Sequence, residues 1–158
     1  MTAMGAIESS ALGQAMRHWL WLYPSVETVH IVGIALLVGS IAILDLRLLG
    51  LSRSLPVRRL AAHILPWSIG SFALIVPSGL AMFTAHAGEL ISNPVFILKI
   101  GLILLAGANA GILHAGVFRN AAQWDVDVMP PLAARAAAAV SLLLWVSVIA
   151  CGRLLAYF

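Results

Sequence analysis

The residues of this sequence with the clearest chemical potential are histidines placed within long apolar runs. The five histidines are His18, His30, His63, His86 and His114. An ionisable side chain inside such a run is costly unless it pairs, lines a polar cavity or binds a cofactor. Imidazole is also a common axial ligand of haem iron and a ligand of copper. The histidines therefore indicate haem or metal binding.

The chain has four apolar runs, each long enough to cross a bilayer, and the first three of them contain all the histidines except His18. They cover about residues 25–50, 60–86, 94–117 and 134–157. About 20 apolar residues rising about 1.5 Å each match a hydrocarbon core of roughly 30 Å. With 62% hydrophobic and 9% charged residues among 158, the chain has more apolar surface than one small globule can bury. The sequence predicts an all-α integral membrane four-helix bundle, a single transmembrane domain over residues 1–158.

A more polar segment of about residues 5–22 precedes the first run. Its apolar and polar side chains alternate at helical spacing, and Trp19, Trp21 and Tyr23 stand at its end. Aromatic side chains of this kind collect at the headgroup level of a membrane. We expect an N-terminal amphipathic helix that lies at the interface and holds His18 there.

The basic residues are divided unequally between the two sides of this bundle. One side holds six arginines, which are Arg47, Arg53, Arg58, Arg59, Arg119 and Arg135. The other side holds Arg17 and Arg153. Because the side richer in basic residues is usually cytoplasmic, we expect a multi-pass protein of the bacterial inner (cytoplasmic) membrane with both termini periplasmic. The basic excess is explained by topology and membrane lipid, and we expect no nucleic-acid partner.

Four histidines fall into two pairs at similar depth in this topology. His30 and His86 lie about 13 and 19 Å on the outer side of the midplane, and His63 and His114 about 16 and 12 Å on the inner side. Two imidazoles at one depth on different helices are what a six-coordinate haem b requires. We expect one haem b at His30 and His86, with His63 and His114 as the site of an optional second. His63 and His86 are about 140° apart around an ideal helix, which weakens the two-haem version.

Two glycines stand close to these ligand candidates. Gly33 follows His30 by three residues, and Gly111 precedes His114 by three. Both would leave room for a flat macrocycle beside the imidazole. Gly107 and Gly111 also form a GxxxG pattern, whose alternative role is to bring two helices together.

Charged residues within the runs offer contacts for a haem. Lys99 and Arg153 lie in the outer half of the bundle. Lys99 could meet a haem propionate, an acidic substrate or a quinone oxygen, or extend to the headgroups, and Arg153 could serve the same propionates. For Asp45 and Arg47 we expect a local ion pair. With Cys151 as its single cysteine, the chain has no Cys-x-x-Cys-His motif, which favours haem b over haem c.

Longer stretches carry a resemblance to a known family. They are WLYPSVETVHIVGIALLVGSIAILDLRLLGL, VPSGLAMFTAH, NPVFILKIGLILLAGANAGILH and GRLLAYF. With them the chain resembles a bacterial family of four-helix membrane proteins known only as a domain of unknown function, which implies a fold and no activity.

Two looser resemblances imply activities. The chain is similar to HemJ-type protoporphyrinogen oxidases, which are haem-binding four-helix proteins with a histidine on the first helix and a lysine on the third. The residues that carry this resemblance are His30, Arg47, Lys99 and His114. His30, Met82 and His86 are similar to the ligands of CopD-type copper proteins, and Met82 and His86 stand one helical turn apart. The first resemblance implies porphyrinogen oxidation, and the second implies copper as the alternative cofactor.

Three functions therefore remain open. The first hypothesis is a small transmembrane b-type cytochrome that passes electrons between a periplasmic partner and the quinone pool, alone or as an oxidoreductase subunit of a larger complex. The second is a HemJ-like enzyme, and the third is copper handling. No residue is assigned a catalytic role.

Overall fold

The computed structural model describes residues 3–157, and every regular element in that range is a helix. The elements are α1 (Ala3–Glu8), α2 (Ala11–His18), α3 (Leu22–Leu48), α4 (Val57–Ala85), α5 (Ala87–Ser92), α6 (Pro94–Ala115), the 3₁₀ helix η1 (Val117–Trp124) and α7 (Leu132–Leu154). By length and composition, α3, α4, α6 and α7 could each cross a membrane. The predicted four-helix membrane bundle is confirmed.

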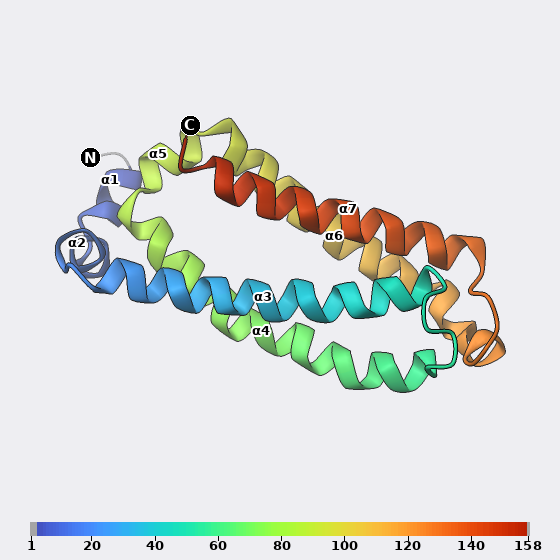
Figure 1. Ribbon diagram of the computed structural model, residues 1–158. Coiled ribbons are helices and arrows are strands. Elements are labelled where there is room, and N and C mark those ends of the chain that lie inside the picture. Colours follow the sequence, from blue (N-terminus) through green and yellow to red (C-terminus); the bar gives the residue numbers. More distant parts are fainter. Residues whose placement is uncertain (1–2, 158) are drawn as a thin grey trace.

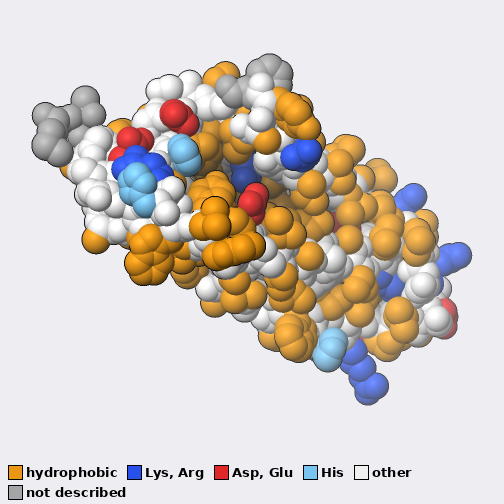
Figure 2. All heavy atoms as spheres, turned by 60° about the vertical axis from the view of Figure 1, so that its left-hand side comes forward, with side chains coloured by type: hydrophobic (Ala, Val, Ile, Leu, Met, Phe, Trp, Pro, Cys, Tyr) orange, Lys and Arg blue, Asp and Glu red, His pale blue; other side chains and the backbone are white. Residues whose placement is uncertain are grey.

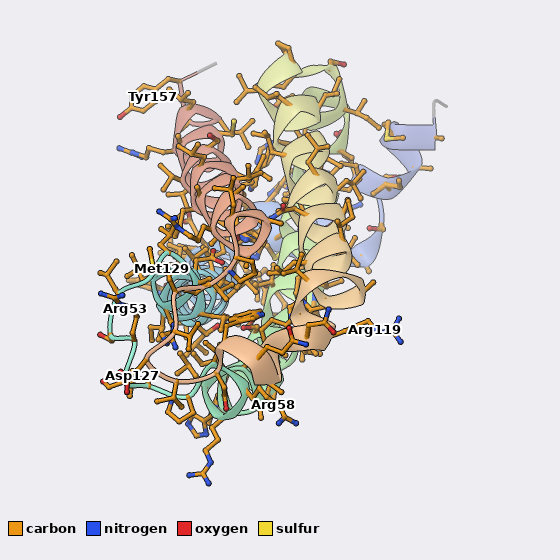
Figure 3. All side chains as sticks on the ribbon, turned by 90° about the vertical axis from the view of Figure 1, so that its right-hand side faces the viewer. Arg53, Arg58, Arg119, Asp127, Met129 and Tyr157 are labelled. Atoms are coloured by element: carbon orange, nitrogen blue, oxygen red, sulfur yellow. The ribbon has the colours of Figure 1, made fainter. Side chains whose placement is uncertain are left out.

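The four long helices form two antiparallel hairpins (Figure 1). One hairpin is α3 with α4, and the other is α6 with α7. The two chain ends lie together with α1, α2 and α5, at what we call the terminal end of the bundle. The α3–α4 connection and η1 lie at the opposite, loop end, where Arg53, Arg58 and Arg119 project outward (Figure 3). Both termini therefore lie at the end away from this basic cluster, as the distribution of arginines predicts.

Helix α4 stays continuous although it contains Pro66 and Pro77. A proline inside a helix commonly kinks or breaks it, because it removes a backbone donor. Serine hydroxyls near them bond to carbonyls three or four residues earlier in the helix: Ser71 Oγ donates to the Ser68 carbonyl at 2.6 Å, and Ser78 Oγ donates to the Leu74 carbonyl. Neither hydroxyl bonds to the carbonyl four residues before a proline, so these bonds accompany the continuous helix and do not replace the lost backbone bonds.

The predicted amphipathic segment is present as two short helices, α1 and α2. Ser10 caps α2 by accepting a hydrogen bond from the Gly13 amide at 3.2 Å, which starts a new helix there. The Arg17 guanidinium donates to the Ala85 carbonyl at 3.3 Å and ties α2 to the end of α4. Beyond α2, Trp19 and Trp21 are 67% and 76% exposed. These two rings are free to lie among lipid headgroups.

Arg47 organises the loop end from inside. Its side chain is 1% exposed. The guanidinium donates to the carbonyls of Leu55, Arg53 and Asp125 at 2.7, 3.1 and 3.0 Å. One buried cation thereby joins the end of α3 to both connecting segments.

The predicted ion pair between Asp45 and Arg47 is wrong. Asp45 is buried and interacts with the Ser141 hydroxyl of α7. Residues two apart on a helix point to different sides, so Asp45 faces α7 while Arg47 faces the loops.

Candidate functional site

The half-buried ring of His30 lies between α3 and α4, in a site formed by Ile75, Ser78 and Gly79 that we call the His30 seat. The Nδ1 atom lies 3.1 Å from the Ile75 carbonyl oxygen and 2.9 Å from Ser78 Oγ. A Cβ atom on Gly79 would come within 3.1 Å of His30 Cε1. Only a glycine at this position of α4 lets the imidazole approach so closely without displacement.

The hydrogen bonds around His30 select one tautomer. The Ile75 carbonyl can only accept, and the Ser78 hydroxyl gives its single proton to a backbone carbonyl of its own helix. Nδ1 must therefore carry the proton and donate it. The Nε2 atom is left with a free lone pair, and it has no hydrogen-bond partner among residues 3–157. A histidine held through Nδ1–H in this way has the usual arrangement of an iron or metal ligand that binds through Nε2.

Lys99 of α6 brings a positive charge to the same region. Its ammonium nitrogen would lie 3.6 Å from a Cβ atom on Gly152 of α7, and it is within electrostatic range of His30. No carboxylate of the described chain forms an ion pair with it. In Figure 2 the surface near the terminal end is hollowed, and Lys or Arg atoms lie inside the hollow. An anionic group bound beside His30 would find its counter-charge here.

His86 lies on the same hairpin as His30 but further toward the terminal end. It is exposed, its Nδ1 is 3.3 Å from a Glu89 carboxylate oxygen, and its ring meets that of Tyr23 edge-on at 6.3 Å. His86 follows Gly79 by seven residues, which would be about 10.5 Å along a helix axis, and its backbone has left the helical conformation, with φ −139° and ψ 40°. The structure thus places His86 just beyond the end of α4, about two turns from the His30 seat, and does not bring the two rings into contact.

The inner histidines are not brought together as a ligand pair. His63 is exposed on α4. His114 bonds through Nδ1 to the carbonyl of Ala110 in its own helix at 2.9 Å and stacks on Phe118 at 5.0 Å. Its Nε2 atom is buried without a partner in the described chain. His114 thus resembles His30 in having Nδ1 held by a backbone carbonyl and Nε2 without a partner, whereas His63 is exposed.

The space expected beside the macrocycle is absent at Gly33. A Cβ atom there would lie 2.7 Å from Ile75 Cγ1, so this glycine permits close packing of α3 on α4. The role of Gly33 beside a cofactor stays a prediction. Gly107 and Gly111 have no neighbour within 4 Å of an added Cβ atom, so their GxxxG joins no helices within the described chain.

Arg153 interacts with Tyr157 close to the end of the chain. Its Nη2 donates to the Tyr157 hydroxyl at 2.9 Å, and the guanidinium lies 5.1 Å from the centre of that ring. Lys99 is therefore the basic residue that the structure associates with His30.

Sequence reasoning missed the residues that make the His30 seat. Ser78 and Gly79 belong to the PSG stretch of α4, and Gly152 lies in α7. The available signal was a glycine next to a serine, Gly79 after Ser78, within a predicted helix. That signal does not reveal which histidine packs against them. Within residues 3–157 the structure has no group of three or more His, Cys, Asp and Glu side chains that could hold a metal ion.

Comparison with known proteins identifies the family of this chain. The model of a family of unknown function, DUF6644, matches residues 5–158. The chain belongs to the DUF6644 family. The predicted membership of a family without assigned activity is confirmed. No curated protein and no solved structure matches the chain, and neither comparison supports the resemblance to HemJ-type or CopD-type proteins.

Proposed function

We propose that this DUF6644 protein is a small membrane-spanning b-type cytochrome with His30 as an axial ligand of its haem. The observation that carries the proposal is the seat of His30, which fixes Nδ1 as a donor to Ile75 and Ser78 and leaves the Nε2 lone pair free. A haem bound there supplies reversible one-electron chemistry. In this proposal Ile75 and Ser78 hold the His30 ring and set its tautomer, and Lys99 supplies a positive charge near the haem.

His86 is the second ligand in this proposal. It follows α4 about two turns from the His30 seat, and its exposed ring contacts Glu89 and the edge of Tyr23. To bind the same iron as His30, the His86 ring must leave these two contacts and move toward the seat. A six-coordinate, low-spin haem is then expected.

The surroundings of His30 suit electron transfer with membrane partners. The site lies in the half of the bundle near the termini, which the positive-inside rule makes periplasmic. Electrons would pass between a partner on that side and a quinone in the bilayer, with the protein acting alone or within a larger complex. The half-buried ammonium of Lys99 would pair with a propionate.

The full-length protein purified in detergent should contain noncovalent haem b. Since the one cysteine, Cys151, is buried in α7, acid-acetone should extract all the porphyrin. A pyridine haemochrome assay with metal analysis measures this directly. Protein carrying stoichiometric copper and no porphyrin would contradict the cytochrome and favour copper handling, while turnover of a porphyrinogen would favour the HemJ-like enzyme.

The Lys99→Met variant should lower the midpoint potential of the haem. A positive charge near the propionates favours the reduced form because it offsets the negative charge gained with the electron. Methionine keeps the length of the side chain and removes the charge. Arg153→Gln is the matched control, since Arg153 is engaged with Tyr157, and spectroelectrochemical titration should show a smaller shift for it. Equal shifts in both variants would indicate a general surface-charge effect.

A further inference from the structure

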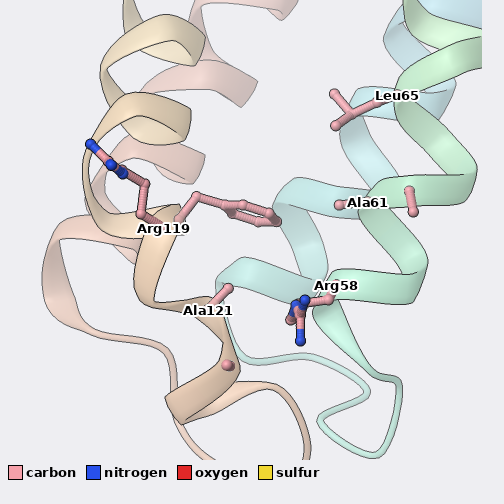
Figure 4. Close-up of a pocket in the computed structure, with 8 residues that line it drawn as sticks. Arg58, Ala61, Leu65, Arg119 and Ala121 are labelled. Atoms are coloured by element: carbon pink, nitrogen blue, oxygen red, sulfur yellow. The ribbon is translucent and has the colours of Figure 1, made fainter.

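A cavity of about 450 Å³ opens at the loop end, far from the His30 seat. Its walls come from the first two turns of α4 and from η1, with Arg58 and Arg119 on opposite sides (Figure 4). Leu65, Phe118 and four alanines complete the lining. Neither His63 nor His114 is among the lining residues.

The two arginines of this cavity are not neutralised by the protein. Both are exposed, and within residues 3–157 neither forms an ion pair. The nearby carboxylate of Asp125 accepts from the backbone amide of Arg58 at 2.8 Å, so it is bound to the start of α4. In Figure 4 the Arg119 side chain points away from Arg58 and α4, so this exposed side chain must turn back over the cavity before both arginines can contact one anion. Guanidinium groups provide forked donors that match phosphate oxygens well.

The polarity of the cavity changes along the membrane normal. Arg58 lies at the first turn of α4, at the membrane surface, and Leu65 lies seven residues or about 10.5 Å deeper. Ala61 between them is buried in the core, and Phe118 packs against that core from η1. A ligand here would meet cations at the membrane surface and apolar side chains below them. A phospholipid matches this arrangement, because its charged headgroup lies at the surface and its acyl chains lie below.

We infer that this cavity binds an anionic phospholipid of the leaflet at the loop end. Its phosphate lies between Arg58 and Arg119, and an acyl chain follows Leu65 and Phe118 toward the membrane interior. Basic pockets between membrane helices are known to recognise such headgroups. This site is independent of the proposed haem.

The inference is tested with the full-length protein in a neutral detergent. The probes are phosphatidylglycerol, phosphatidylcholine and inorganic phosphate, with bound lipid counted by native mass spectrometry and the thermal midpoint measured in parallel. Wild-type protein should retain phosphatidylglycerol and be stabilised by it, and phosphatidylcholine or phosphate should do neither. The double variant Arg58→Gln with Arg119→Gln should bind phosphatidylglycerol about 30-fold more weakly.

Two further variants separate the cavity from general surface charge. Arg53→Gln with Arg59→Gln removes the same charge from the same end and should retain the lipid. Ala62→Phe keeps both cavity arginines, fills the apolar part and should weaken binding. The inference is overturned by equal losses in the two double variants, by stabilisation with inorganic phosphate alone, or by loss of haem absorbance on changing Arg58 and Arg119.

Discussion

The His30→Ala variant is expected to be purified without haem, or with a small fraction of the wild-type content. The tautomer of His30 is fixed with Nε2 free, and removing an axial ligand leaves the iron five-coordinate or releases the porphyrin. The ratio of Soret to protein absorbance and the haemochrome content measure the loss.

The Ser78→Ala variant should keep the haem but bind it more weakly, because mutating the hydrogen-bond partner of a ligating histidine typically lowers affinity 10–100-fold.

His86→Ala should convert a low-spin spectrum to a high-spin one, and the double variant with His30→Ala should add little to the single loss. Groups that hold one iron are non-additive, whereas independent packing residues give additive effects. His18→Ala and His63→Ala are the controls and should leave the spectrum unchanged. An unchanged low-spin spectrum in both His30→Ala and His86→Ala would exclude the outer pair and make His114 the leading ligand.

The second large effect is expected on stability, from Arg47→Met. The side chain is 1% exposed and donates to three carbonyls from two connecting segments. Methionine fills much of the space but leaves those carbonyls unpaired, so the free energy of unfolding should fall by about 3 kcal/mol or more. Thermal unfolding in detergent, followed by circular dichroism, measures the change.

Arg59→Met is the matched control for this prediction. Arg59 is exposed and lies close in sequence, so its replacement should change stability by less than about 0.5 kcal/mol. A similar loss in the two variants would mean that the loop end responds to total positive charge, with no special contribution from the three-carbonyl contact.

The sequence by itself determined the number of spans, their approximate limits and the placement of both termini at one end. These features depend on properties that add up along the chain. Helix length follows from the apolar run, and the side richer in arginines follows from counting. The continuity of α4 through Pro66 and Pro77 does not follow from the sequence, because a proline inside a helical run removes a backbone donor and commonly indicates a kink or a break.

The tertiary structure decided which residues meet. From the sequence, His30 and His86 were paired because they have similar depths in the membrane. In the folded chain the packing of α3 on α4 places the His30 ring against Gly79. The same packing fills the space beside Gly33 with Ile75. A sequence gives the height of a side chain and its direction around its own helix, and it does not give the rotation of one helix against another. That rotation is set by packing among side chains distant in sequence, which is why the seat of His30 and the cavity at Arg58 appear only in the folded chain.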